Sequence, residues 1–329
     1  MEKESKSFIP FLLMLVIMLT MPLSNLSSND NLTEIQITEN TTSARAQTTW
    51  SGVVELSQSY TVNITDELII APCTVVKLPN AARIFVEGRL TIDGDIACPV
   101  TLTQDGNGLH YGIQFNQSSY GRGSVIDNLS IDNSMYGVTI YGANPDLNNI
   151  SIINPSRVGI DLFSGATPTI SDLFVDQSGR GFFYSDWRYG IGLSVGASSS
   201  PIVERATLSD MRIRGLNIWG DSGGIYRQIT IDNISAEGAS AISAGVWVED
   251  SRPLITNVTV DKSDYGILIR HIDDGGYTRA VVRDCQVTNS MYRGIYVDKA
   301  NHTNFTNYET ADFTNTVVRG TGGPNAKTA

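Results

Sequence analysis

The sequence has few of the residues that build metal sites and basic interfaces. Its 329 residues include three cysteines, three histidines, and 23 lysines and arginines against 34 aspartates and glutamates. His110, His271 and His302 are far apart and no cysteines form a C-x-x-C pair, so the sequence predicts no zinc or copper site. With a net charge of −11 it also lacks the clustered basic face that nucleic acid requires. Nucleic-acid binding is therefore excluded.

Helical periodicity is scarce, and short alternating runs of apolar and polar residues replace it. Eight such runs begin with a glycine, at Gly112, Gly137, Gly159, Gly190, Gly215, Gly245, Gly266 and Gly294. A second alternating run follows, for example NLSI (128–131), NISI (149–152) and NVTV (257–260). The turn DNSMYG (132–137) returns as DKSDYG (261–266). The chain is therefore a repeat of β-strands.

The glycines that begin these runs are 21 to 31 residues apart, which is a solenoid period. A unit with two or three strands and no helix buries its apolar side only by stacking on its neighbours. The prediction is an all-β fold, a right-handed single-stranded parallel β-helix with about eight to ten coils. Val138, Ile140, Leu129 and Ile131 are predicted to point into its core.

These runs resemble the right-handed β-helix repeat of pectin-lyase-like proteins and of many archaeal and bacterial surface proteins, over about residues 52 to 320. The resemblance is specific for architecture and weak for chemistry. The sequence lacks the Gly-His-Gly, Arg-Ile-Lys and Asn-Thr-Asp motifs of polygalacturonases and shows no acidic cluster with an arginine of the pectate-lyase pattern.

Composition divides the chain into five segments. Residues 1–23 carry two lysines before a short apolar run and predict a secretory signal peptide, or alternatively an uncleaved anchor. Residues 24–49 are polar and predict a disordered linker. Residues 50–105 predict N-terminal coils that cap the solenoid, 106–320 the repeated coils and 321–329 a tail. The expected location is extracellular or at the cell surface, with a further solenoid or capping module over the open C-terminal end.

Cysteines and asparagines suggest two modifications. Cys73 and Cys98 are separated by 25 residues, close to one coil, which predicts a disulfide on neighbouring turns, with two separate thiols as the alternative. Cys285 is expected in the core. Eleven N-x-S/T triplets predict glycosylation, although composition alone also produces such triplets. They begin at Asn25, Asn31, Asn40, Asn63, Asn116, Asn128, Asn149, Asn233, Asn257, Asn301 and Asn304.

Aligning the first runs by their glycines gives two columns of outward side chains. The first is Gln114, Thr139, Asp161, Gly192, Asn217, Trp247, Leu268 and Tyr296, and the second is Asn116, Tyr141, Phe163, Ser194, Trp219, Glu249, Arg270 and Asp298. Aromatic and charged residues concentrate from 215 to 298, where the long turns 176–190, 232–245 and 270–280 would wall a groove. The second runs carry a plain polar column instead.

This groove supplies the candidate ligand-binding residues Trp187, Trp219, Trp247 and Tyr296. A pyranose presents a flat C–H face that packs on an aromatic ring. The alternative is that Trp219 and Trp247 pack under the long turns as a satellite core.

Weak catalytic candidates lie on the same coils. Glu249, Arg270 and Asp298 fall at one register and form either an acid–base set or an ion ladder, with the ladder favoured. His271, Asp273 and Asp274 either hold Ca²⁺ or do acid–base work, or form an ordinary turn, which is favoured. No other cofactor is expected.

The leading hypothesis is therefore a secreted or surface β-helix that binds polysaccharide or surface glycan, or acts as a scaffold module, without an identifiable catalytic motif. The alternative is a polysaccharide lyase or glycoside hydrolase acting on an acidic polysaccharide in the groove over the coils at 215–298. A scaffold β-helix of a larger assembly is a third possibility.

Overall fold

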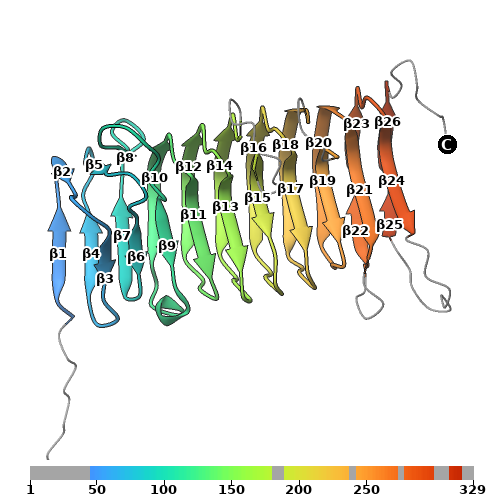
Figure 1. The fold of residues 1–329 in the computed structure, drawn as a ribbon. Helices are drawn as coiled ribbons and strands as arrows, with labels where there is room; N and C mark the ends of the chain where they lie inside the picture. Colours follow the sequence, from blue (N-terminus) through green and yellow to red (C-terminus); the bar gives the residue numbers. More distant parts are fainter. Residues whose placement is uncertain (1–44, 180–188, 237–241, 273–277, 300–310, 321–329) are drawn as a thin grey trace, which may run out of the picture. The chain divides into compact units, whose positions relative to one another are not determined.

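The structure, a computed structural model, describes residues 45–179, 189–236, 242–272, 278–299 and 311–320. Within these ranges the regular elements are β-strands, apart from the 3-10 helix η1 (Gln117–Ser119). None of the described helical residues forms a segment long and apolar enough to cross a membrane. The strands build two parallel sheets that stack coil on coil (Figure 1).

Sheet B contains ten strands, one per coil, in which each strand pairs with the equivalent strand of the next coil. Their order along the sheet is the order of the sequence: β3 (Tyr60–Val62), β6 (Ile84–Val86), β9 (Ile113–Phe115), β11 (Tyr136–Tyr141), β13 (Val158–Phe163), β15 (Ile191–Val195), β17 (Arg214–Trp219), β19 (Ala244–Glu249), β21 (Tyr265–His271) and β24 (Arg293–Lys299).

Among the residues that the structure describes, sheet A contains sixteen strands. Its main path is β1 (Gln47–Trp50), β4 (Glu67–Ile70), β7 (Arg89–Asp93), β10 (Val125–Asp132), β12 (Asp146–Ile153), β14 (Thr169–Asp176), β16 (Ile202–Ser209), β18 (Ile225–Ile234), β20 (Leu254–Ser263), β22 (Ala280–Arg283) and β25 (Ala311–Thr314). Beside it lie β2 (Val53–Glu55), β5 (Val75–Leu78), β8 (Val100–Gln104), β23 (Gln286–Thr288) and β26 (Val317–Arg319).

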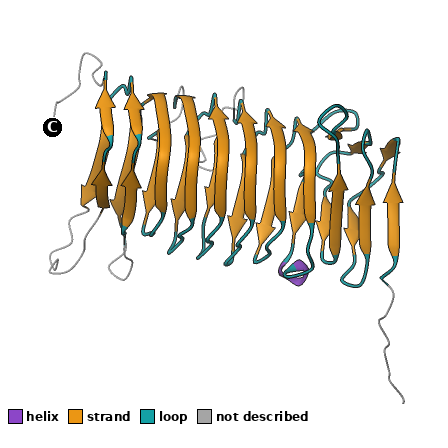
Figure 2. Ribbon diagram, turned by 180° about the vertical axis from the view of Figure 1, so that it is seen from behind, coloured by secondary structure: helices purple, strands orange, loops and turns teal. Residues whose placement is uncertain are grey.

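The strand β10 marks a change in the structure of the coils, from two separate strands in sheet A to one long bent strand. Its first half pairs with β7 and its second half with β8, so one bent strand continues two separate ones. The bend falls at Asn128, whose φ is +54°, in the left-handed region that Asn and Gly tolerate best. Later coils repeat the bend at Asn149, Asp172 and, further on, Asn257. The view from behind shows the bent strands side by side (Figure 2).

The core lies between the sheets and consists of stacked aliphatic side chains. Val138, Ile140, Leu129 and Ile131 are at most 1% exposed, as predicted, and Cys285 continues the same stack. A fully buried aliphatic side chain stabilises the fold by about 1.5–3 kcal/mol, and each coil contributes several. The predicted right-handed parallel β-helix is confirmed, with ten coils in sheet B.

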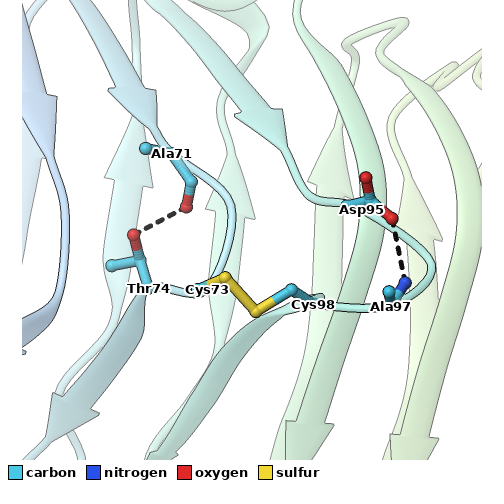
Figure 3. The surroundings of a disulfide bond; sticks show 6 residues. All are labelled: Ala71, Cys73, Thr74, Asp95, Ala97 and Cys98. Atoms are coloured by element: carbon cyan, nitrogen blue, oxygen red, sulfur yellow. Dashed lines mark hydrogen bonds between the residues drawn. A yellow bond between two sulfur atoms is a disulfide. The ribbon is translucent and has the colours of Figure 1, made fainter.

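The N-terminal coils are joined by the predicted disulfide. Cys73 and Cys98 are bonded, and their Cα atoms lie 4.8 Å apart (Figure 3). Thr74 Oγ1 donates a hydrogen bond to the carbonyl of Ala71 beside one cysteine, and the Ala97 amide donates to Asp95 Oδ1 beside the other. The cystine thus links the bend after β4 to the loop between β7 and β8.

Strand pairing begins slightly earlier than the composition suggested. β1 starts at Gln47 and pairs with β4, so the last three residues of the predicted linker (24–49) form a strand. The strand reads Gln-Thr-Thr-Trp and has no apolar–polar alternation, so the sequence pattern does not reveal it. The predicted signal peptide (1–23) and tail (321–329) lie outside the described residues.

Candidate functional site

The outer face of sheet B carries a cleft of about 440 Å³ over the middle of the solenoid. It crosses the coils from β6 to β17, and its walls and floor come from three columns of side chains. The lining residues are Arg83, Tyr111, Met135, Tyr136, Thr139, Tyr141, Arg157, Val158, Asp161, Phe163, Ile191, Ser194 and Trp219.

The floor of the cleft is polar. Thr139, Asp161 and Ser194 occupy one register on successive strands, so their outward side chains stack at the strand spacing of about 4.8 Å. Each is less than 7% exposed because the flanking columns rise above it. A carboxylate between two hydroxyls can accept hydrogen bonds from ligand hydroxyl groups.

One wall of the cleft is aromatic. Tyr141 and Phe163 are stacked with ring centroids 5.3 Å apart, and Trp219 meets Phe163 edge-on at 6.2 Å. Trp219 reaches Phe163 because Gly196, directly after β15, stands at the corresponding position of the coil between them, where any Cβ would overlap the indole ring. The continuous wall therefore depends on one glycine.

The opposite wall centres on Arg157. Its Nη1 donates to the hydroxyl of Tyr136 at 2.7 Å and its Nη2 to that of Tyr189 at 2.9 Å. The guanidinium also lies 4.4 Å from the Tyr189 ring centroid. Burial by itself lowers the pKa of Arg157, but the two hydrogen bonds outweigh this and raise it. Arg157 is thus a fixed positive charge with a set orientation.

A second arginine stands at the N-terminal end of the cleft. Arg83 lies 4.5 Å from the Tyr111 ring centroid, and its Nη1 donates to Gln114 Oε1. Burial lowers the pKa of Arg83, yet a guanidinium remains ionised at neutral pH. The lining therefore holds two cations and one carboxylate, Asp161, on a chain whose net charge is −11.

Tyr141 completes the polar groups of the aromatic wall. Burial raises its pKa, and the nearby Asp161 carboxylate raises it further. The phenol therefore stays protonated at neutral pH and presents an O–H donor to the cleft.

The register predicted for one strand was wrong. Strand β15 aligns Ser194 with Asp161 and Asn217, so Ser194 belongs to the first outward column, not the second. The glycine that begins the run is accordingly Gly192, whereas Gly190 lies in the preceding turn. The run GIGLSVG holds three glycines with the same alternation, and nothing in the sequence distinguishes them.

Trp247 faces outward as the register predicts, but it is only 3% exposed. Arg214 lies 3.8 Å and Arg270 5.2 Å from its ring centroid, and Leu268 packs against it. Burial lowers the pKa of Arg214 to about 10. The expectation of an exposed ligand-stacking tryptophan fails here, and the satellite-core alternative describes Trp247.

Trp219 keeps its predicted place on the open face as part of the aromatic wall. Tyr296 is half-buried and packs against Tyr265 and Arg293, away from the residues that line the cleft. Trp187 lies outside the described residues. The four predicted ligand-binding residues are thus not one cluster.

Glu249, Arg270 and Asp298 stand at one register, as predicted. Arg270 Nε lies 3.9 Å from Glu249 Oε2, and the same oxygen accepts a hydrogen bond from Trp247 Nε1 at 3.1 Å. Such a pair stabilises a sheet face by less than about 1 kcal/mol. The contact between Glu249 and Arg270 fits the favoured ion ladder.

His271 is buried and points inward from the end of β21. Its Nδ1 lies 2.7 Å from Asp250 Oδ1, which also accepts the Ile272 amide at 3.0 Å. The contact between His271 and Asp250 therefore stabilises a turn. Because His271 is buried, it is not placed for the acid–base role considered for it. Asp273 and Asp274 lie outside the described residues. Within the described ranges no three His, Cys, Asp or Glu side chains gather as a metal site would require.

The cleft lies nearer the N-terminus than the groove predicted over 215–298, and the two share Trp219. Arg83, Tyr136 and Arg157 were not predicted from the sequence, and Asp161 was predicted only as a member of the first outward column. Tyr136 precedes Gly137 by one residue and Arg157 precedes Gly159 by two. Tyr136 pairs with Val158, so the two residues stand at different registers and no single outward column contains both.

Known proteins support the fold. The family model for a right handed beta helix region matches residues 103–253. An alginate lyase from Paenibacillus sp. str. FPU-7 aligns with a TM-score of 0.54 and 12% identity, covering 81% of this chain and 99% of that one. The catalytic domain of a GH87 α-1,3-glucanase in complex with nigerose aligns with a TM-score of 0.44 and 16% identity, over 82% of this chain and 65% of its own.

No curated protein matches the sequence. At these identities the structural likeness shows the fold alone, and the glucanase alignment adds no argument. The resemblance to right-handed parallel β-helix proteins is thus confirmed at the level of the fold. What the site does must be argued from its own residues.

Proposed function

We propose that this protein binds a carboxylate-bearing polysaccharide or surface glycan in the cleft on sheet B. The observation that carries the proposal is Arg157, held by two tyrosine hydroxyls opposite an aromatic wall. An arginine pairs with a carboxylate through two parallel hydrogen bonds, and an aromatic ring packs on the apolar face of a pyranose. The cleft offers both within one set of coils.

The proposal includes an extracellular or cell-surface location, supported by the signal peptide predicted over residues 1–23 and by the Cys73–Cys98 disulfide. The alginate lyase with the same fold acts on a polysaccharide, as its name says, which makes such a ligand reasonable for this architecture.

A matched pair of ligands tests the binding. Acidic polysaccharides are titrated into the protein by calorimetry, beside the same polymers after chemical reduction of their carboxyl groups. We expect the reduced polymers to bind at least about tenfold more weakly, a loss of about 1.4 kcal/mol. Arg157→Ala should produce a similar loss. Thr207→Ala with Thr230→Ala, on the polar face of sheet A, should leave affinity unchanged.

Equal binding of native and reduced polymers would contradict a carboxylate-directed site. Full affinity of the Arg157 variant would place the site elsewhere on the solenoid.

A β-elimination activity is the second candidate, favoured by the arrangement of Arg157, Tyr136 and Tyr141. In such a step a base removes the proton α to the sugar carboxylate and an acid protonates the departing glycosidic oxygen; the C–O bond breaks and a C=C bond forms. Arg157 would neutralise the carboxylate. Tyr136 beside it would receive the proton as a phenolate, having first released its own proton to solvent, and Tyr141, which stays protonated, would donate one.

Glycoside hydrolysis fits the cleft less well. Hydrolases of most families need two carboxyl groups across the scissile bond, and Asp161 is the one acidic residue among the described lining residues. Following absorbance of the unsaturated product together with new reducing ends separates the possibilities. Absorbance that rises with wild type and is lost with Tyr141→Phe supports elimination, whereas reducing ends without absorbance support hydrolysis.

A further inference from the structure

The six N-x-S/T triplets within the described residues fall into different structural settings. Four of them, at Asn128, Asn149, Asn233 and Asn257, belong to the strands of sheet A. Their middle residues, Leu129, Ile150, Ile234 and Val258, are core side chains no more than 1% exposed.

The same architecture explains why the triplets at Asn128, Asn149 and Asn257 recur. The first position is the left-handed bend, which favours asparagine: φ is +54° at Asn128, +53° at Asn149 and +53° at Asn257. The third position faces outward on a strand, where Ser and Thr are common. The fold therefore generates the triplet without any modification being involved.

The side-chain amides at the bend also take part in contacts between coils. Asn128 Nδ2 donates to the Gly94 carbonyl at 2.7 Å, and Asn149 Nδ2 donates to Asn128 Oδ1 at 2.6 Å. An enzyme that reads the triplet must contact all three residues. In the folded sheet the middle one is buried and the backbone is paired on both sides.

Asn63 differs in its exposure and in its place in a turn instead of a paired strand. Asn63, Ile64 and Thr65 form the turn between β3 and β4, all three are exposed, and Ile64 is 48% exposed. The Asp66 amide donates to the Asn63 carbonyl at 2.8 Å, which fixes the backbone of the turn. Asn63 Nδ2 donates to Asp66 Oδ2 at 2.8 Å, so its contact stays within the exposed turn and does not join two coils. The sixth triplet, at Asn116, is half-buried, and Asn116 Oδ1 accepts a hydrogen bond from Gln114.

We propose that Asn63 is an N-glycosylation site of the folded protein, and that the triplets at Asn116, Asn128, Asn149, Asn233 and Asn257 are not. The donor is an oligosaccharide linked to a lipid phosphate. Asn63 Nδ2 forms the bond to the anomeric carbon, that carbon's bond to the phosphate oxygen breaks, one amide proton is released and the lipid phosphate departs. This inference does not rest on the proposed function.

The test compares the folded chain with its own peptides. Folded full-length protein and its tryptic digest are each incubated with a purified oligosaccharyltransferase and a lipid-phosphate-linked oligosaccharide, using an enzyme preparation that modifies the strand triplets in the digest. Glycopeptide mass spectrometry then locates the sugar. In the folded protein we expect the sugar at Asn63 and at none of the four strand asparagines.

Two matched variants separate modification from structure, since both leave the asparagine in place. Thr65→Ala should abolish the mass increase at Asn63, and Ser151→Ala should change nothing in the folded protein. Sugar on Asn128, Asn149 or Asn257 of the folded chain overturns the proposal. So does an unmodified Asn63 in folded protein whose digest is modified there.

Discussion

Single residues in the left-handed backbone region make the bends of this solenoid. The bend between the halves of the sheet A strands uses Asn128, Asn149, Asp172 and Arg205, with φ between +53° and +55°. Arg205 is an unusual choice, and its guanidinium binds both carboxylate oxygens of Asp172 on the preceding coil at 2.7 and 2.8 Å. The residues with a left-handed backbone are therefore also residues whose side chains contact the neighbouring coil.

Two substitutions of Asn149 should separate these contributions. Asn149→Gly keeps the left-handed backbone and loses the hydrogen bond to Asn128, so we expect a cost below about 1 kcal/mol. Asn149→Val also forces a β-branched residue into that region and should cost about 1–2 kcal/mol more. Urea unfolding of both variants gives the comparison; equal stabilities would mean that the bend is not strained.

His110 should make stability depend on pH. It is fully buried; Nε2 lies 2.9 Å from the Asp132 carbonyl, and Nδ1 accepts the Gly112 amide at 3.1 Å, so the ring is neutral. Burial lowers the pKa of His110 below its ordinary value. The contribution of the neutral His110 ring to the free energy of unfolding is therefore complete above about pH 6.5. It is lost as the pH falls through the lowered pKa that His110 has in the folded state. At each pH, the free energy of unfolding of the His110→Gln variant is subtracted from that of the wild type, which isolates the effect of His110. A difference that does not change with pH would contradict the prediction.

Gly196 should control the aromatic wall of the cleft. A Cβ at this position would overlap the Trp219 ring, so Gly196→Ala should push the indole away from Phe163. We expect a shift in tryptophan fluorescence and about tenfold weaker glycan binding, with the unfolding transition largely kept. Gly223→Ala, whose new Cβ would lie 3.5 Å from its nearest neighbour, is the control.

At the scale of the element, the strands of sheet B explain the glycine that begins each repeat. A Cβ at Gly159 would lie 2.6 Å from the carbonyl oxygen of Gly192 and 2.6 Å from Val175 Cγ1. The next strand and the facing sheet therefore both exclude a side chain. The glycine marks the closest approach of the two sheets.

Gly159→Ala should accordingly destabilise the stack by about 1–3 kcal/mol, the usual cost of overpacking a core. Thermal unfolding of this variant beside Gly223→Ala measures the effect. If the two variants melt together, the sheets can move apart at this position without cost.

The same strands show how far the sequence can lead. Alternation, the leading glycine and the core positions such as Val138 follow from local pattern, because each is decided within one coil. The cleft is assembled from side chains spread from Arg83 to Trp219, and the burial of Trp247 depends on Arg214 from another coil. The sequence predicts which side chains point outward from a strand. It does not predict how exposed they are, because side chains of neighbouring columns cover them.

At the scale of the whole molecule, the coils form a one-dimensional stack in which each contacts its neighbours. The disulfide acts on one end of this stack. It closes a loop across a sequence separation of 25, which predicts about 3 kcal/mol of stabilisation.

Reduction should therefore loosen the N-terminal coils first. We expect faster amide hydrogen exchange in β4 to β8 after treatment with dithiothreitol, while exchange in β18 to β21 stays the same. Cys285→Ser serves as the background, since its thiol is buried and takes no part in the bond. Uniform acceleration along the chain would mean that the solenoid opens as a single cooperative unit.

From β10 to β20 each strand pairs residue for residue with the equivalent strand of the next coil, so equivalent residues repeat at a constant spacing along the solenoid. Gain or loss of a whole coil by recombination would leave every remaining register intact, while a partial coil would misplace each following strand. The separation between Arg83 and Arg157 can thus change only in increments of one strand spacing, about 4.8 Å. In homologous chains with more or fewer coils, the length of the cleft would then differ by whole multiples of this spacing. The length of the ligand that fits would change in the same discrete steps.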